Sequence, residues 1–126
     1  MRLLLDTHVV LWALGEPERL SDEVRSLIAD PANEVYVSAV TVWEVEIKRA
    51  IGKLTAPDGF AEEVVERGFD GLPIDMAHAS AAGRLPLLHA DPFDRMLVAQ
   101  AMEERLAIVT DDRSIAAYGT DILPAT

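Results

Sequence analysis

The stretch "RLLLDTHVVLWALG" at residues 2–15 decides the fold class, because an apolar run is interrupted by one aspartate and then resumes. Residues 3–6 predict a buried strand, and residues 6–15 predict a short helix that ends near Gly15. A carboxylate inside such a run costs free energy unless another group satisfies it. Asp6 therefore needs either a capping role at the start of the helix or a partner elsewhere in the chain.

The same alternation of short apolar runs and helical patterns continues along the chain. Further strands are predicted at 35–38, 72–74, 106–110 and 121–123. Further helices are predicted at 21–30, 39–51, 58–67, 76–83, 92–105 and 112–119. Alternating strands and helices favour parallel pairing, and continuous apolar strands are typical of a sheet covered on both faces. We therefore predict one domain, residues 1–126, with an α/β fold: a three-layer α/β/α sandwich around a central parallel sheet of about five strands.

Composition excludes several classes of protein. With no cysteine, nothing points to an oxidising compartment or a thiolate zinc site. No stretch reaches the roughly 20 apolar residues that span a bilayer, and no signal-peptide cleavage site follows the first apolar run, so we expect a cytoplasmic protein. The net charge of −11 disfavours bulk electrostatic binding of nucleic acid. If the protein binds a polyanion, it then requires a bound cation or a local basic patch. The alternative is that its partner is basic and not a polyanion.

Several acidic residues have ordinary structural explanations when they are taken singly. Asp6 can cap the first helix, and Asp112 can cap the last one in competition with Asp111. Asp94 falls at the third helical position behind the N-cap Asp91, where the helix dipole favours an acid. Each of these explanations is sufficient for one residue alone.

Glu44 is the fourth acid of interest, and Lys48 lies four residues after it on the same predicted helix. Such a pair adds about 0.2–0.5 kcal/mol to helix stability, so an ordinary ion pair and a functional role stay equally open. Lys48, Arg49 and Lys53 form the densest basic cluster of the chain. We expect a solvated helix face there, with nucleic-acid contact as the alternative.

The joint placement of the four acids favours a functional explanation. In a parallel sheet the strand C-termini and helix N-termini share one edge, so the acids converge if the first and fourth strands are neighbours. Two carboxylates about 5 Å apart repel by about 3 kcal/mol at an effective dielectric of about 20. Such a cluster needs protons or a cation, and oxygen ligands favour Mg²⁺ or Mn²⁺. A site of this kind suits phosphodiester hydrolysis by a metal-activated water.

Four segments resemble the PIN-domain family, and in particular the VapC-type toxins of prokaryotic toxin–antitoxin modules. They are "LLLDTHVVLWAL" at 3–14, "VSAVTVWEVEIKRAIGKL" at 37–54, "LHADPFDRMLVAQA" at 88–101 and "IVTDDRSIAAYG" at 108–119. The likeness covers nearly the whole chain, and the motifs stand in the family's order. Any one motif is weak, but the four together are specific.

This resemblance implies a Mg²⁺- or Mn²⁺-dependent ribonuclease with parallel strands in the order 3-2-1-4-5. The metal-binding and catalytic residues that it implies are Asp6, Glu44, Asp94 and Asp112, with Thr110 as the hydroxyl that orients the cluster. It also implies an RNA substrate, 5′-phosphate and 3′-hydroxyl product ends, a homodimer, and an antitoxin whose basic or apolar tail occludes the groove. Asp111 and Ala90 depart from the family pattern, and both make the mouth of the site more negative.

Two other classes stay open. One is a catalytically silent PIN-like module that binds RNA or protein. The other is a Mg²⁺-dependent phosphatase or phospho-acceptor on a similar sheet. Against the second, a haloacid-dehalogenase-type site needs an acid where His8 stands, and a receiver-type site needs a late lysine, whereas no lysine follows Lys53.

Some residues near the motifs have expected structural roles. We expect His8 to be packed or to cap a helix, with a minor role at the site as proton donor or hydrogen-bond partner as the alternative. We expect His89 to be structural. Arg95 and Arg113 each follow a proposed site acid, so each either contacts a substrate phosphate or pairs with a nearby acid.

Overall fold

Five parallel strands form the sheet of the computed structural model, which describes residues 1–56 and 58–126. The order is β3-β2-β1-β4-β5, as the family resemblance implies, so the first and fourth strands are neighbours. Leu4 in β1 has Tyr36 as its Cα partner on one side and Ile108 on the other, which makes β1 the central strand. The strand bounds are β1 Arg2–Leu5, β2 Glu34–Ser38, β3 Asp70–Leu72, β4 Ala107–Val109 and β5 Ile122–Leu123.

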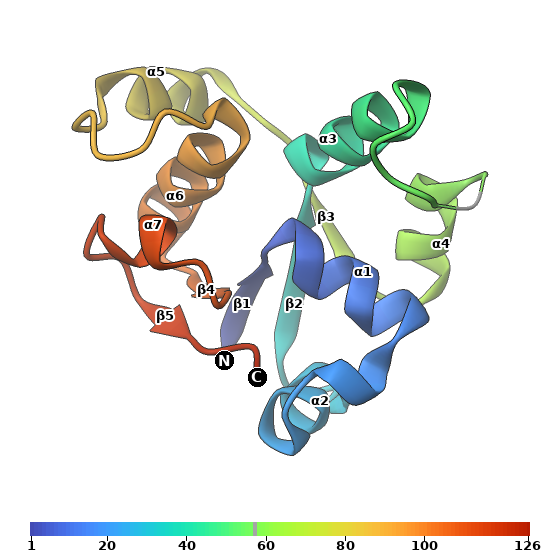
Figure 1. Cartoon of the computed structure of the whole chain (residues 1–126). Helices are drawn as coiled ribbons and strands as arrows, with labels where there is room; N and C mark the ends of the chain where they lie inside the picture. Colours follow the sequence, from blue (N-terminus) through green and yellow to red (C-terminus); the bar gives the residue numbers. More distant parts are fainter. Residues whose placement is uncertain (57) are drawn as a thin grey trace.

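Helices cover both faces of this sheet, which confirms the predicted three-layer sandwich (Figure 1). α1, α2 and α4 pack on one face, α6 and α7 pack on the other, α5 packs against α6, and α3 contributes to both cores. The helix bounds are α1 Thr7–Gly15, η1 Pro17–Arg19, α2 Asp22–Ala29, α3 Ala39–Ala50, α4 Phe60–Glu66, α5 Met76–Arg84, α6 Pro92–Glu104 and α7 Arg113–Ala116.

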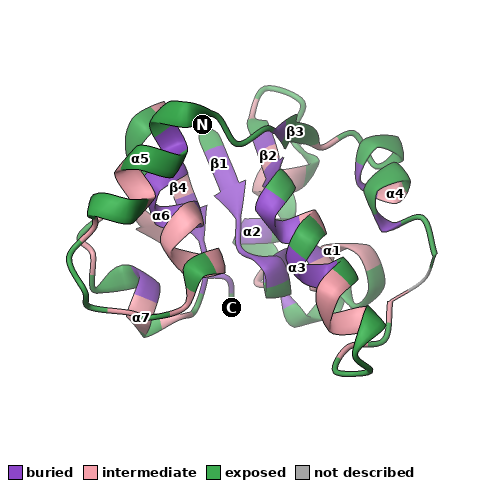
Figure 2. Ribbon diagram, turned by 90° about the horizontal axis from the view of Figure 1, so that it is seen from above, coloured by how far each residue is buried: buried purple, intermediate pink, exposed green. Residues whose placement is uncertain are grey.

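The leucines of β1 anchor it in both cores at once. Leu3 and Leu5 point into the core under α1, α2 and α4, whereas Leu4 points into the core under α6. All three are fully buried, and Figure 2 shows β1 as a buried strand between exposed outer helix faces. Burial of this kind contributes about 1.5–3 kcal/mol for each leucine. The chain that leaves β1 at Asp6 is therefore held firmly.

Serine side chains cap two of the helices. Ser21 Oγ accepts a hydrogen bond from the Val24 amide at the start of α2, and Ser38 Oγ accepts one from the Val40 amide at the start of α3. Each bond satisfies an amide that has no partner inside its helix. The second cap fixes where α3 begins after β2, and therefore fixes the position of Glu44 relative to the end of that strand.

The third strand differs from its prediction. It runs from Asp70 to Leu72 and not over 72–74. Pro73 follows directly, and a proline has no amide hydrogen to continue the ladder. The apolar letters "LPI" therefore mark the end of the strand and the approach to α5. No helix in the described part of the chain is long and apolar enough to cross a membrane.

His78 is a structural residue that carries no signal in the sequence. It is 2% exposed and completes a capping box with Asp75 at the start of α5. Its Nδ1 accepts from the Asp75 amide, and its Nε2 donates to Glu104 over 2.8 Å. Gln100 Nε2 also approaches Nδ1. These contacts tie α5 to α6, the helix that carries Asp94.

Candidate metal centre

The acids predicted for the site line one pocket at the carboxyl edge of the sheet. Asp6 follows β1, Asp112 follows β4, Asp94 lies in the first turn of α6, and Glu44 lies in the second turn of α3. The pocket has a volume of about 310 Å³ and is lined by Asp6, Thr7, His8, Val9, Trp12, Glu44, Lys48, Asp91, Asp94, Asp111 and Asp112. The structure therefore brings together all four acids, which lie up to 106 positions apart in the chain (112 − 6).

Thr110 links two of these acids. Its hydroxyl donates a 2.6 Å hydrogen bond to Asp6 Oδ2 and accepts one of 3.0 Å from the Asp112 amide. Asp6 stands at the N-cap position of α1, but its side chain makes no capping hydrogen bond, so the capping explanation for this residue is wrong. Asp112 does cap α7, because its Oδ1 accepts from the Ser114 amide. Both carboxylates line the pocket.

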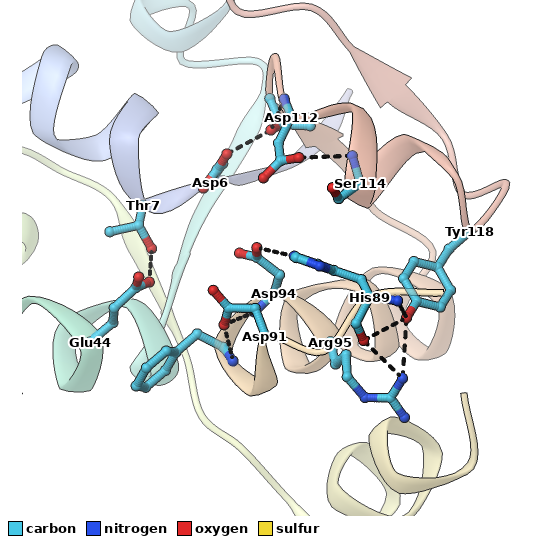
Figure 3. A network of polar contacts seen from close by, with 12 residues as sticks. Asp6, Thr7, Glu44, His89, Asp91, Asp94, Arg95, Asp112, Ser114 and Tyr118 are labelled. Carbon is cyan, nitrogen blue, oxygen red and sulfur yellow. Dashed lines mark hydrogen bonds and ion pairs between the residues drawn. The ribbon is translucent and has the colours of Figure 1, made fainter. Parts of the chain in front are cut away.

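Asp94 lies opposite these two carboxylates and is bonded to His89 (Figure 3). His89 Nε2 donates to Asp94 Oδ2 over 2.8 Å. Asp91 caps the same helix, as predicted, by accepting from the amides of Phe93 and Asp94. His89 was expected to be structural, yet it contacts a proposed site acid directly. Only its position five residues before Asp94, within "LHADPFD", hints at this contact in the sequence.

Glu44 is buried and is bonded by the protein at both oxygens. Thr7 Oγ1 donates to Oε1 over 2.7 Å, and Lys48 Nζ donates to Oε2 over 2.5 Å. Thr7 Oγ1 also lies 3.2 Å from Thr41 Oγ1, so α1 and α3 meet at this carboxylate. The predicted pair of Glu44 and Lys48 is confirmed. Only 6% of the Glu44 side chain is exposed, which makes the pair more consequential than one on a solvated helix face.

Burial raises the pKa of two of the acids above the ordinary value of 3.8. For Asp94, burial and the charges of neighbouring aspartates outweigh the hydrogen bond from His89 and raise the pKa to about 6. For Asp6, burial likewise raises the pKa although the hydrogen bond from Thr110 lowers it. Both shifts mean that the site disfavours its own negative charge. A bound cation relieves that cost.

The neighbouring Asp111 is turned toward the end of the chain. Its carboxylate accepts hydrogen bonds from the amides of Ala125 and Thr126 and from the Thr126 hydroxyl. Burial raises the pKa of Asp111, but these hydrogen bonds outweigh it and the net pKa is lowered. Asp111 therefore stays ionised and adds negative charge at the rim of the pocket, where the family pattern is often basic or polar.

The structure corrects two expectations for basic residues. His8 is exposed on the first turn of α1 and lines the pocket, which agrees with the alternative that it points toward the site and not with a packed or capping residue. Arg95 neither pairs with an acid nor faces the pocket, because its guanidinium donates to main-chain carbonyls and to the Tyr118 hydroxyl. The carbonyls belong to Ala82, Leu85, Pro86 and His89. Arg95 therefore holds the loop that carries His89.

The donor groups present fit a hard divalent cation. Ligand atoms of His89, Asp94 and Asp112 lie within 4.8 Å of one another, and Asp6 lines the same pocket. Figure 3 shows Asp6, Asp94 and Asp112 directed into a common space, with Glu44 set to one side at Thr7. Carboxylate oxygens with room for water suit Mg²⁺ and Mn²⁺.

The family profile of the PIN domain matches residues 3–120. The chain belongs to the PIN domain family, as its motifs predicted. Within that family it is similar to VapC-type proteins. It is 33% identical over 124 residues to Ribonuclease VapC22 of Mycobacterium tuberculosis (strain ATCC 25618 / H37Rv), an alignment that covers 92% of this chain and 91% of that protein. It is also 33% identical over 63 residues to Ribonuclease VapC16 of the same strain, covering 47% of this chain and 45% of that protein.

Solved structures agree with the fold. VapBC2 from Rickettsia felis, bound to a DNA fragment from its promoter, matches with a TM-score of 0.75 and 12% identity over 100% of both chains. DNA-bound VapBC from Salmonella typhimurium matches with a TM-score of 0.73 and 19% identity over 98% of this chain and 97% of that one. At these identities the likeness concerns the fold alone.

Proposed function

We propose that this protein is a Mg²⁺- or Mn²⁺-dependent endoribonuclease and the toxin of a type II toxin–antitoxin pair. The observation that carries the proposal is the convergence of Asp6, Glu44, Asp94 and Asp112 in one pocket, where burial raises the pKa of Asp6 and Asp94. A structural role explains each acid singly but not their assembly. The similarity to Ribonuclease VapC22 supports the substrate class.

Asp6, Asp94 and Asp112 would hold the ion, with Glu44 as the fourth carboxylate of the cluster. When bound, a divalent ion supplies Lewis acidity toward phosphate and water and neutralises charge that develops on the phosphate. The roles of the protein groups follow from their hydrogen bonds. Thr110 orients Asp6, and His89 orients Asp94, so that each carboxylate keeps one oxygen toward the pocket.

Entry of RNA into so acidic a pocket needs help from positive charge. The acids repel a phosphate until a cation offsets them, because the pocket contains like charges at short range. Among the described residues that line the pocket, Lys48 is the one lysine, and its ammonium group supplies part of that positive charge. The ion supplies the rest. This predicts strict dependence of RNA binding, as well as cleavage, on the divalent cation.

The partners of the protein are part of the proposal. We propose a cognate antitoxin that covers the acidic pocket with a basic or apolar segment, since the net charge of −11 favours a basic inhibitor. The fold matches chains of VapBC complexes, which supports a partner of this kind. Homodimerisation and a cytoplasmic location complete the proposal.

A cleavage assay tests the activity. Purified protein is incubated with total transfer, ribosomal and messenger RNA in Mg²⁺ or Mn²⁺, with and without a chelator, and the product ends are mapped. Cleavage that needs the ion and leaves 5′-phosphate and 3′-hydroxyl ends is the expected result. Ion-dependent RNA binding without any cleavage would instead favour a silent binding module.

A further inference from the structure

Lys48 lines the pocket, but the cluster of acids does not explain its role. It projects from α3, and its ammonium donates to the buried Glu44 carboxylate over 2.5 Å. The charges of Asp91 and Asp94 also act on it. Among the described residues that line the pocket, six are acids and Lys48 is the one lysine or arginine. It therefore stands as a fixed cation inside an acidic cluster.

The hydrogen bonds of Glu44 separate it from the other three acids. Thr7 occupies Oε1 and Lys48 occupies Oε2, so both oxygens already have protein donors. A buried carboxylate is either paired or bound to a metal, and Glu44 is paired. Asp6 and Asp94 are in the opposite situation. Asp6 is 7% exposed and the Asp94 side chain is 14% exposed, and no lysine or arginine forms an ion pair with either among the described residues.

We propose that Lys48 takes the place of a second metal ion, so that the pocket binds one divalent cation at Asp6, Asp94 and Asp112. This inference rests on the proposed function and adds to it the number of ions and a role for Lys48. An ammonium is a compact point charge that neutralises Glu44 without leaving the chain.

Counting bound ions tests this inference without using activity. Mn²⁺ is titrated into the parent protein and the Lys48→Met variant, and free Mn²⁺ is followed by electron paramagnetic resonance. We expect one tight site for each chain in the parent and two in Lys48→Met, because the variant leaves Glu44 without its cation. Lys48→Arg is the matched control that keeps the charge, and Lys53→Met is the control for removing an exposed lysine nearby. Both should bind one ion.

A second variant keeps the test decisive if Lys48→Met does not fold. Glu44→Gln should still bind one ion. Its Mn²⁺ affinity should fall less than about tenfold, whereas loss of a metal ligand or of its orienting partner lowers the affinity about tenfold or more. The inference is overturned if the parent binds two ions, if a folded Lys48→Met binds one, or if Glu44→Gln loses the ion. If none of the proteins binds Mn²⁺, the metal dependence in the proposed function fails as well, and the two failures are thus distinguishable.

Discussion

Thr110 lies 104 positions from Asp6 in the chain, and its hydroxyl donates a 2.6 Å hydrogen bond to the Asp6 carboxylate. The same hydroxyl accepts from the amide of Asp112. Thr110 is 1% exposed, so water does not replace these contacts. One buried side chain therefore sets the relative positions of two acids that end neighbouring strands.

Replacing Thr110 with valine should weaken metal binding while the fold is kept. Valine has nearly the same shape but leaves Asp6 and the Asp112 amide without a partner. Loss of an orienting partner lowers metal affinity about 10–100-fold, and an unsatisfied buried group costs about 1–3 kcal/mol of unfolding free energy. Mn²⁺ titration and urea unfolding measure the two effects. Thr110→Ser keeps the hydroxyl and should restore most of both, and an unchanged Mn²⁺ affinity in Thr110→Val would contradict the role given to Thr110.

Asp6→Asn should abolish RNA cleavage without unfolding the protein. The side-chain amide of asparagine lacks the negative charge that a metal ligand supplies. It also avoids the free-energy cost of burying that charge, which raises the pKa of Asp6, so the metal-free variant should be at least as stable as the parent. Cleavage assays and urea unfolding in a chelator give the two readouts. Asp121→Asn is the matched control, because Asp121 is exposed and precedes β5 at the opposite edge of the sheet. Cleavage at the parental rate by Asp6→Asn would refute the site assignment.

The stability of the metal-free protein should fall as pH rises through the range in which Asp94 ionises. The folded state raises the pKa of Asp94 from 3.8 to about 6, so the folded protein binds this proton more tightly than the unfolded chain does. The contribution of Asp94 to stability is therefore full below about pH 4 and is lost by about pH 6–7. Urea unfolding of the parent and of Asp94→Asn in chelator, across this range, isolates the effect.

In Mn²⁺ the trend should reverse. The ion competes with the proton for the Asp94 carboxylate, so the stabilisation by Mn²⁺ should grow as pH rises through about 6. Parallel pH curves for the parent and Asp94→Asn, with or without the ion, would show that Asp94 ionises as an ordinary exposed acid.

Arg95→Lys should loosen the loop before α6 although the positive charge is kept. The guanidinium contacts several carbonyls and the Tyr118 hydroxyl at once, and a lysine cannot reach them together. Hydrogen exchange should accelerate at the His89 amide, which donates to Tyr118, while amides of β1 stay protected. Mn²⁺ affinity should fall with it, because His89 then holds Asp94 less firmly. Arg113→Lys, on the exposed face of α7, is the control.

The regular part of the molecule was predictable from its sequence because periodic burial determines it. The apolar runs of β1 and β4 predict the sheet, and the helical pattern that follows β2 predicts α3. The shared edge of a parallel sheet then brings Asp6 and Glu44 together. Asp91 could be recognised as a cap because proline follows it directly. Each of these inferences depends on neighbours in the sequence.

The irregular contacts were not predictable because they join residues that lie far apart in the sequence or in loops without periodic burial. His89 is aimed at Asp94 by a loop that Tyr118 and Arg95 hold, and Tyr118 lies 29 positions from His89. Asp111 is turned away by Thr126, 15 positions further on. Periodicity carries no information on such pairs, because they form only after the sheet has assembled.

The central position of β1 has a consequence for synthesis. Asp6 is translated 104 positions before Thr110, so β4, Thr110 and Asp112 emerge from the ribosome much later than β1. β4 must then insert beside a strand made long before. A partly translated chain therefore holds no complete acidic cluster. If cleavage requires that cluster, the growing chain is harmless to the messenger RNA that encodes it. Ribosome-bound chains stalled before residue 107, assayed for nuclease activity beside the released protein, would test this order of events.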